Sequence, residues 1–88
     1  MARFVMRRDN KDISADILRL ATHSVIKTHI VYGANLNFEI VESYLSRLTG
    51  LGLLDESRDG RKTYRTTEKG LDFINKYEEL AKFGIGVN

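Results

Sequence analysis

The segment GANLN, residues 33–37, constrains the fold of this chain more than any other feature, because it separates two helical patterns by only a few residues. Before it, residues 25–32 form a short helical segment with Ser24 at the capping position. After it, Asn37 is placed to cap a helix over residues 38–49. Two helices joined by so short a turn predict a helix-turn-helix motif.

The second of these helices is amphipathic. Its apolar residues recur at helical spacing, with Ile40 widening the face: Phe38, Val41, Tyr44, Leu45 and Leu48. The opposite face holds Glu39, Glu42, Ser43, Ser46 and Arg47. Glycines at 50 and 52 end the helix, so we expect one face in the core and one in solvent.

A short β-hairpin follows at once. Residues 53–57 and 62–66 are suited to pair as strands around the Asp59-Gly60 turn, because glycine tolerates the positive φ that tight hairpins need. A hairpin this short is unstable alone, so it should pack on the helices through Leu53, Leu54 and Tyr64. Behind a helix-turn-helix, such a hairpin is a wing.

Two further helices complete the pattern. Asp9 is placed to cap a helix over residues 10–22, and Thr67 to cap one over 68–82. The last helix is more apolar than a lone surface helix requires, which favours a dimerisation face; its candidate residues are Leu71, Phe73, Ile74, Tyr77 and Leu80. The alternative is that this face covers the protein's own first helix.

The fold class is therefore mainly α (α+β): a winged helix-turn-helix of three helices, a two-stranded wing and a C-terminal helix. With 88 residues there is room for a single domain, 1–88. We divide it into a basic arm (1–9), the helix-turn-helix with its wing (10–66) and the C-terminal helix (67–83).

Positive charge is concentrated in two short segments. Residues 1–11 and 57–65 each carry a net charge of +3, whereas 12–56 carry −3 and 66–88 carry −1. Cations gathered on an arm and a hairpin tip favour an anionic partner. The alternative is a hairpin tip kept soluble by its charge.

Two ordered segments carry a resemblance to a known family. KTHIVYGANLNFEIVESYLSRLTGLGLL followed by YRTTEKGLDFINKYEEL resembles the archaeal winged-helix regulators of the ArnR-like class, relatives of the small Sulfolobus chromatin-associated winged-helix proteins. The resemblance covers residues 13–80. It implies binding of double-stranded DNA, with the third helix in the major groove and the wing on the backbone or minor groove. It also implies a homodimer built through the last helix.

The candidate DNA-binding residues lie in four places. They are Arg58, Arg61, Lys62 and Arg65 in the wing, Asn37, Ser43, Ser46 and Arg47 at the third helix, Lys27 and Thr28 in the second helix, and Arg7 and Arg8 in the arm. Arg47 and Ser43 can reach either a base edge or a phosphate. Glu39 and Glu42 lie on the same helix, and their negative charge disfavours close approach to DNA. Whether this helix reads base sequence is therefore an open question. For the arm and for the start of the second helix, an ordinary solvated surface is an equal alternative.

Catalysis finds no support in the residue pattern. His23 and His29 lack the same-face spacing of a metal pair, cysteine is absent, and no cofactor loop is formed, so we expect no enzyme activity, metal, cofactor or small-molecule ligand. Asp12 and Asp16 share a helix face and are expected to be solvated. No apolar run reaches membrane-spanning length, which predicts a cytoplasmic, nucleoid-associated protein.

The function predicted from the sequence is a homodimeric transcriptional regulator that binds specific DNA sites. Two alternatives remain. One is an architectural chromatin protein with low sequence specificity, and the other is a winged-helix module that binds protein.

Overall fold

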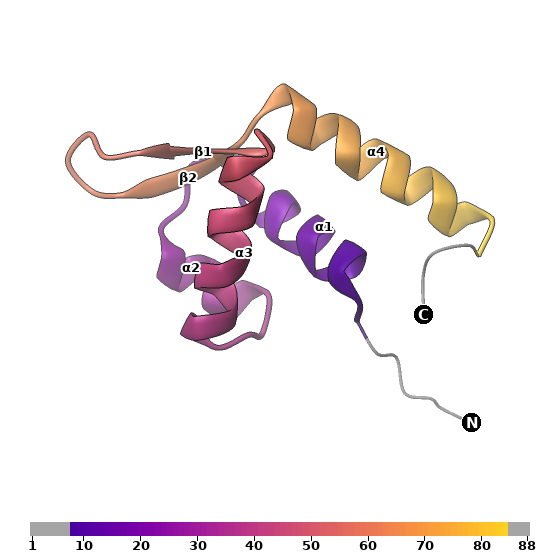
Figure 1. Ribbon diagram of the computed structural model, residues 1–88, viewed down its shortest axis with the longest axis horizontal. Helices are drawn as coiled ribbons and strands as arrows, with labels where there is room; N and C mark the ends of the chain where they lie inside the picture. The colour runs from indigo at the N-terminus through magenta and orange to yellow at the C-terminus, as the bar shows by residue number, and fades with distance from the viewer. Residues whose placement is uncertain (1–7, 85–88) are drawn as a thin grey trace.

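The computed structural model describes residues 8–84, and Figure 1 shows the order of its elements. The helices are α1 (Asn10–Leu20), α2 (Lys27–Gly33), α3 (Phe38–Gly50) and α4 (Glu68–Lys82). Between α3 and α4, strands β1 (Leu54–Ser57) and β2 (Thr63–Thr66) form an antiparallel pair. This arrangement confirms the winged helix-turn-helix fold predicted from the sequence.

Three helix starts are capped as their sequences predict. Asp9 accepts a hydrogen bond from the backbone N–H of Asp12, whose side chain in turn accepts from the N–H of Asp9. The side chain of Asn37 accepts from Ile40 N at 2.8 Å, and that of Thr67 from Gly70 N at 3.0 Å. Each cap satisfies backbone donors that the first helical turn leaves free.

The start of α2 differs from the prediction. Ser24 does not cap it; the helix begins at Lys27, and Ile26 at the cap position makes no side-chain hydrogen bond. Val25 instead forms an antiparallel bridge with Tyr64, with N–H···O distances of 3.0 and 2.8 Å. The chain before α2 is extended because it pairs with the edge of β2, which satisfies its backbone groups without a helix.

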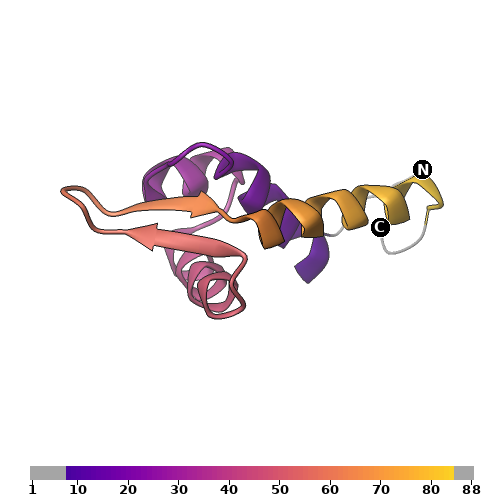
Figure 2. The same cartoon turned by 90° about the horizontal axis from the view of Figure 1, so that it is seen from above.

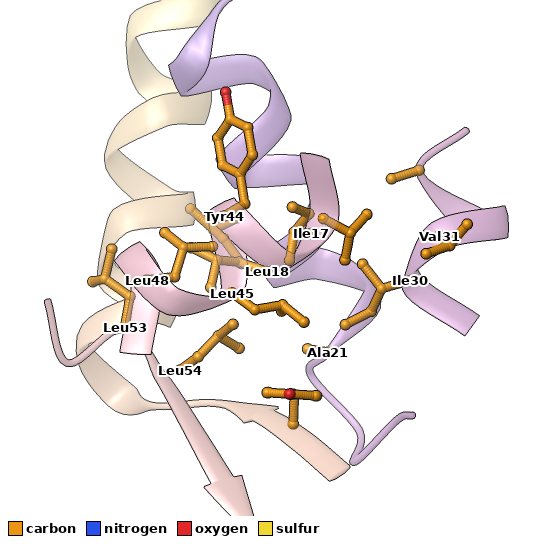
Figure 3. Close-up of a cluster of buried hydrophobic side chains, with 14 residues drawn as sticks. Ile17, Leu18, Ala21, Ile30, Val31, Tyr44, Leu45, Leu48, Leu53 and Leu54 are labelled. Atoms are coloured by element: carbon orange, nitrogen blue, oxygen red, sulfur yellow. The ribbon is translucent and has the colours of Figure 1, made fainter. Parts of the chain in front are cut away.

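The core lies where the first three helices meet the base of the hairpin. Figure 3 shows side chains of α1, α2, α3 and β1 converging there. Its largest fully buried members are Ile17, Leu18, Ile30, Val41, Leu48 and Leu54. Phe38 and Ile40 were expected on this face but are 48% and 39% exposed. Both belong to the first turn of α3, and the buried stripe of that helix begins only at Val41.

The segment that starts α4 is fastened to the connection between α3 and β1. Thr67 donates its hydroxyl to Gly52 O at 2.7 Å, and Lys69 Nζ donates to Leu51 O at 2.9 Å. A Cβ added to Gly70 would lie 2.4 Å from Leu53 O. The glycine is therefore required by the close approach of two backbones.

The middle of α4 meets α1 through a polar cluster, which we call the α1–α4 contact: Asp12, Arg19, Tyr77 and Glu78. The Tyr77 hydroxyl donates to Asp12, which is buried, and Arg19 reaches Glu78 at 3.2 Å while its guanidinium lies 5.6 Å from the Tyr77 ring centroid. The expectation that Asp12 is solvated was wrong, because this carboxylate joins two helices.

The wing and the C-terminal end of α4 lie at opposite ends of the molecule. Figure 2 shows the hairpin extending to one side of the helical body and α4 to the other. The extents of the molecule are 47 × 26 × 19 Å. A site on the wing is thus well separated from a contact surface on the end of α4.

Candidate nucleic-acid interface

A cleft of about 290 Å³ separates α3 from the wing. We call it the α3–wing cleft. Its lining comprises Glu42, Leu45, Ser46 and Thr49 from α3, and Glu56, Lys62 and Tyr64 from the hairpin. Residues far apart in the sequence meet here because β1 follows α3 directly and packs against it. In this cleft the helix predicted to recognise DNA and the wing share a surface.

Glu56 organises the wing side of this cleft. Its Oε2 atom accepts a hydrogen bond from Arg58 Nε at 2.8 Å and lies 3.4 Å from Lys62 Nζ. The hydrogen bond from Arg58, together with Lys62, holds the pKa of the Glu56 carboxyl below its usual value. Two of the four predicted wing cations are therefore paired with one carboxylate that the sequence analysis had not singled out.

A second carboxylate of the cleft is also paired. Lys27, in the first turn of α2, donates to Glu42 on α3. This hydrogen bond lowers the pKa of Glu42 and raises that of Lys27. Thr28 is exposed beside it. The pairing explains how a carboxylate is accommodated on this side of α3, and it places Lys27 beside the cleft.

The wing cations do not share one face. In the strand register Glu56 lies opposite Tyr64, and Asp55 lies opposite Arg65. Directly opposed residues of a strand pair project to the same face, and successive residues alternate. Arg65 is therefore on the face away from Glu56, while Arg61 lies at the exposed tip. The wing offers cations to both sides and at its end.

The outward face of α3 is exposed as predicted, including Ser43, Ser46 and Arg47. The guanidinium of Arg47 lies 5.2 Å from the centroid of the Tyr44 ring. Arg47 follows Glu42 by five residues, which places the two about 140° apart around the helix. Asn37 is committed to capping the helix. Arg47 is thus available on the flank of α3 away from the cleft.

Of the two candidate DNA-binding residues in the arm, the structure describes Arg8. Arg8 Nη1 donates to Ala34 O at 2.9 Å and to Asp16 Oδ2 at 3.1 Å, so its charge is paired against α1 and the turn after α2. Arg7 lies outside the described residues. The geometry of Arg8 favours a role in holding the start of the chain to the helix-turn-helix.

The predicted dimerisation residues fall into two environments. Ile74 is only 8% exposed and belongs to the core, while Phe73 and Tyr77 are partly buried. Leu71 and Leu80 are exposed, but nine residues apart they lie about 180° from each other around α4. The sequence analysis missed Phe83, which is 77% exposed three residues beyond Leu80. Its helical spacing from Leu80 was the sequence pattern that could have identified Phe83.

Three observations bear on other functions. Tyr32 is 75% exposed on α2. Across residues 8–84, no helix combines the length and apolar character needed to cross a membrane. Over the same residues, no three histidine, aspartate or glutamate side chains gather as a metal site.

Comparison with solved structures finds several similar folds. Sso10a-2, a DNA-binding protein from Sulfolobus solfataricus, is 31% identical with a TM-score of 0.80, covering 86% of this chain and 81% of its own. TubR, solved bound to 24 bp of tubC from Bacillus thuringiensis, has a TM-score of 0.69 at 21% identity, covering 80% and 83%. Lactococcus lactis ZitR has a TM-score of 0.63 at 16% identity, covering 81% of this chain and 51% of its own. No curated protein sequence gives a significant match.

The sequence itself matches a family profile described as winged helix-turn-helix, over residues 7–84. The match includes α1 to α4 and the wing, so it covers every element described above. The similarity to Sso10a-2 agrees with the Sulfolobus part of the predicted resemblance. On these grounds the chain belongs to the winged helix-turn-helix family.

Proposed function

We propose that this protein binds double-stranded DNA as a homodimeric, sequence-specific transcriptional regulator, with α3 in the major groove and the wing on the backbone or minor groove. The observation that carries the proposal is that the α3–wing cleft has cations from two sides, Lys27 on α2 and Lys62 on the wing, beside an exposed α3. The similarity to the DNA-binding protein Sso10a-2 supports it. Membership of the ArnR-like class and a cytoplasmic, nucleoid-associated location belong to the same proposal.

Binding should depend strongly on salt. Two protomers that each contact about four to six phosphates would displace enough counterions to give a log–log slope near −7 to −11. The wing should supply much of this term, because Arg58, Arg61 and Lys62 are exposed at the end of the molecule.

The first test replaces Arg58, Arg61 and Lys62 by alanine. We expect weaker binding to every duplex and a shallower salt slope in fluorescence-anisotropy titrations at about 50 and 200 mM salt, since phosphate contacts carry no sequence information. A charge-matched control replaces Lys11, Lys76 and Lys82, which lie on α1 and α4. Equal losses in the two triple variants would contradict the role of the wing.

The second test separates base readout from backbone binding. Arg47→Ala should reduce the ratio of affinities for specific and random duplexes if the guanidinium reaches a guanine edge. Ser43→Ala and Ser46→Ala provide smaller steps along the same face. A uniform loss on both duplexes would place Arg47 on a phosphate.

An architectural role is the second candidate. Glu39 and Glu42 lie on the exposed side of α3, and carboxylates there oppose close approach to base edges and phosphates. Genome-wide footprinting distinguishes the two functions, because a regulator protects discrete operators and an architectural protein covers DNA broadly.

The proposed dimer surface on α4 is smaller than the set of residues predicted from the sequence. Ile74 is committed to the core and Phe73 packs against it, whereas Leu80 and Phe83 are exposed on one side of α4 at its C-terminal end. A second copy of the chain covering this side would bury their apolar surface. Leu80→Asp should therefore produce monomers in sedimentation-velocity experiments, while Leu71→Asp, on the opposite flank, should leave the dimer intact.

A further inference from the structure

The charges around the α3–wing cleft nearly cancel. Lys27, Arg58 and Lys62 are held by two carboxylates, Glu42 and Glu56, which leaves a net charge of +1. Glu56 contacts two cations that come from opposite ends of the wing loop, and its side chain is 26% exposed. A hairpin that simply presented positive charge to DNA would not need a carboxylate at this position.

We propose that Glu56 is a positioning and selectivity residue for DNA binding, which holds Arg58 and Lys62 on the α3 side of the wing and competes with DNA phosphate for both. The inference rests on the proposed function and adds a residue to it. Glu56 weakens binding to any polyanion, because Arg58 or Lys62 must leave its carboxylate before it can contact a phosphate.

The geometry of the hairpin shows how Glu56 competes with phosphate. Ladder pairing of the strands ends at Ser57 and Thr63, so Arg58 and Lys62 extend beyond the paired backbone and are held by their contacts with Glu56. When a phosphate takes one of them, the Glu56 carboxylate remains in the cleft that Glu42 also lines. This carboxylate and the incoming phosphate carry like charges and repel, which offsets part of the gain from the phosphate contact.

The test compares two variants of equal net charge. Glu56→Gln keeps the size of the side chain and removes its charge. Asp55→Asn removes the same charge from the neighbouring position of β1, on the other face of the hairpin. Neither residue is in the core, so both variants should keep the wild-type circular dichroism spectrum and melting temperature.

The first measurement is affinity for a random-sequence duplex by fluorescence anisotropy. We expect Glu56→Gln to bind about three- to tenfold more tightly, since two exposed ion pairs are lost from the free protein. The salt slope should steepen by about one. Asp55→Asn should change affinity by no more than about twofold, because its charge is screened by solvent. Equal effects of the two variants, or weaker binding by Glu56→Gln, would overturn the proposal.

A second comparison isolates the cations. With Arg58 and Lys62 both replaced by alanine, Glu56→Gln has no cation to release, so its gain in affinity should disappear. A gain that persisted would assign the effect to general repulsion and overturn the pairing argument.

Elution from heparin resin decides the same point without duplex DNA. Glu56→Gln should elute at higher salt than Asp55→Asn, because heparin is also a polyanion; co-elution would overturn the role of Glu56. If the wild-type protein bound no duplex, the proposed function would fail, and the heparin order would still decide what Glu56 does.

Discussion

The α1–α4 contact and the α3–wing cleft are both built from paired charges, yet their surroundings differ. In the first, Asp12 is 8% exposed, and its carboxylate accepts hydrogen bonds from the N–H of Asp9 and from the hydroxyl of Tyr77. In the second, Glu56 and Lys62 line an open cleft, and Arg58, the other partner of Glu56, is 76% exposed. Buried pairs cost much when one partner is removed, whereas exposed pairs exchange readily with solvent or a ligand.

The difference in burial suggests different roles for the two regions. The α1–α4 contact and the fastening at Gly70 fix the direction in which α4 leaves the body, and with it the geometry of any dimer. We expect the cleft pairs to contribute little to stability because their side chains are solvent-accessible, which would leave their cations available to an anionic partner.

The largest effect should come from the fastening. Gly70→Ala places a Cβ against Leu53 O, so we expect the free energy of unfolding to fall by about 3 kcal/mol or more. Gly50→Ala is the matched control, because no atom lies within 4 Å of its added Cβ. Urea denaturation should show that variant unchanged or stabilised by up to about 1 kcal/mol. Similar losses of stability in both variants would contradict the view that the close approach of Gly70 to Leu53 O stabilises the fold.

The next largest loss of stability is expected at the hydrogen bond between Tyr77 and the buried Asp12. Tyr77→Phe removes the hydroxyl that donates to Asp12 and leaves a buried carboxylate with one partner fewer. We expect a loss of about 1–2 kcal/mol in the free energy of unfolding. If denaturation showed no change, the contact would be no more than a surface pair, and the two regions would not differ.

A pH titration sharpens the same point. Burial, followed by the hydrogen bond to Asp12, raises the pKa of Tyr77 to about 12. In the unfolded chain this phenol has its ordinary pKa of 10.0, so the unfolded state loses its proton first. Stability should therefore fall between about pH 10 and 12, and fall less steeply in Tyr77→Phe. Identical slopes in the two proteins would contradict the burial.

The smallest effect is expected in the cleft. Glu42→Gln breaks the pair with Lys27, in which the Glu42 side chain is 63% exposed, so stability should change by no more than about 0.5 kcal/mol. A loss comparable to that of Tyr77→Phe would show that the cleft pairs hold the fold together. In that case they would not be free to exchange with phosphate.

Much of the fold was predictable because its determinants are local. The caps at Asp9, Asn37 and Thr67 each use a side chain and a backbone N–H three residues away. The hairpin turn depends on Gly60, whose φ is +83°. Interactions over so few residues are visible in the sequence, and they were confirmed.

The errors have a common cause. Val25 looked helical but pairs with β2, Phe38 looked buried but lies in an exposed turn, and Asp12 looked solvated but is covered by α4. Periodicity shows which side of a helix is apolar, but it does not show where the neighbouring element begins or ends. The candidate DNA-binding residues were named from charge and spacing, and their role remains a prediction.

The sequence alone determined the order of helices and strands, the caps, the turn and the concentration of positive charge on the wing, since these follow from side-chain chemistry over a few neighbouring residues. Tertiary structure decided which charges are paired. Only when β1 packs against α3 do Glu42 and Glu56 line one cleft, and only when α4 crosses α1 does Tyr77 cover Asp12. Pairing depends on distance in space and on burial, and neither is encoded by spacing along the chain.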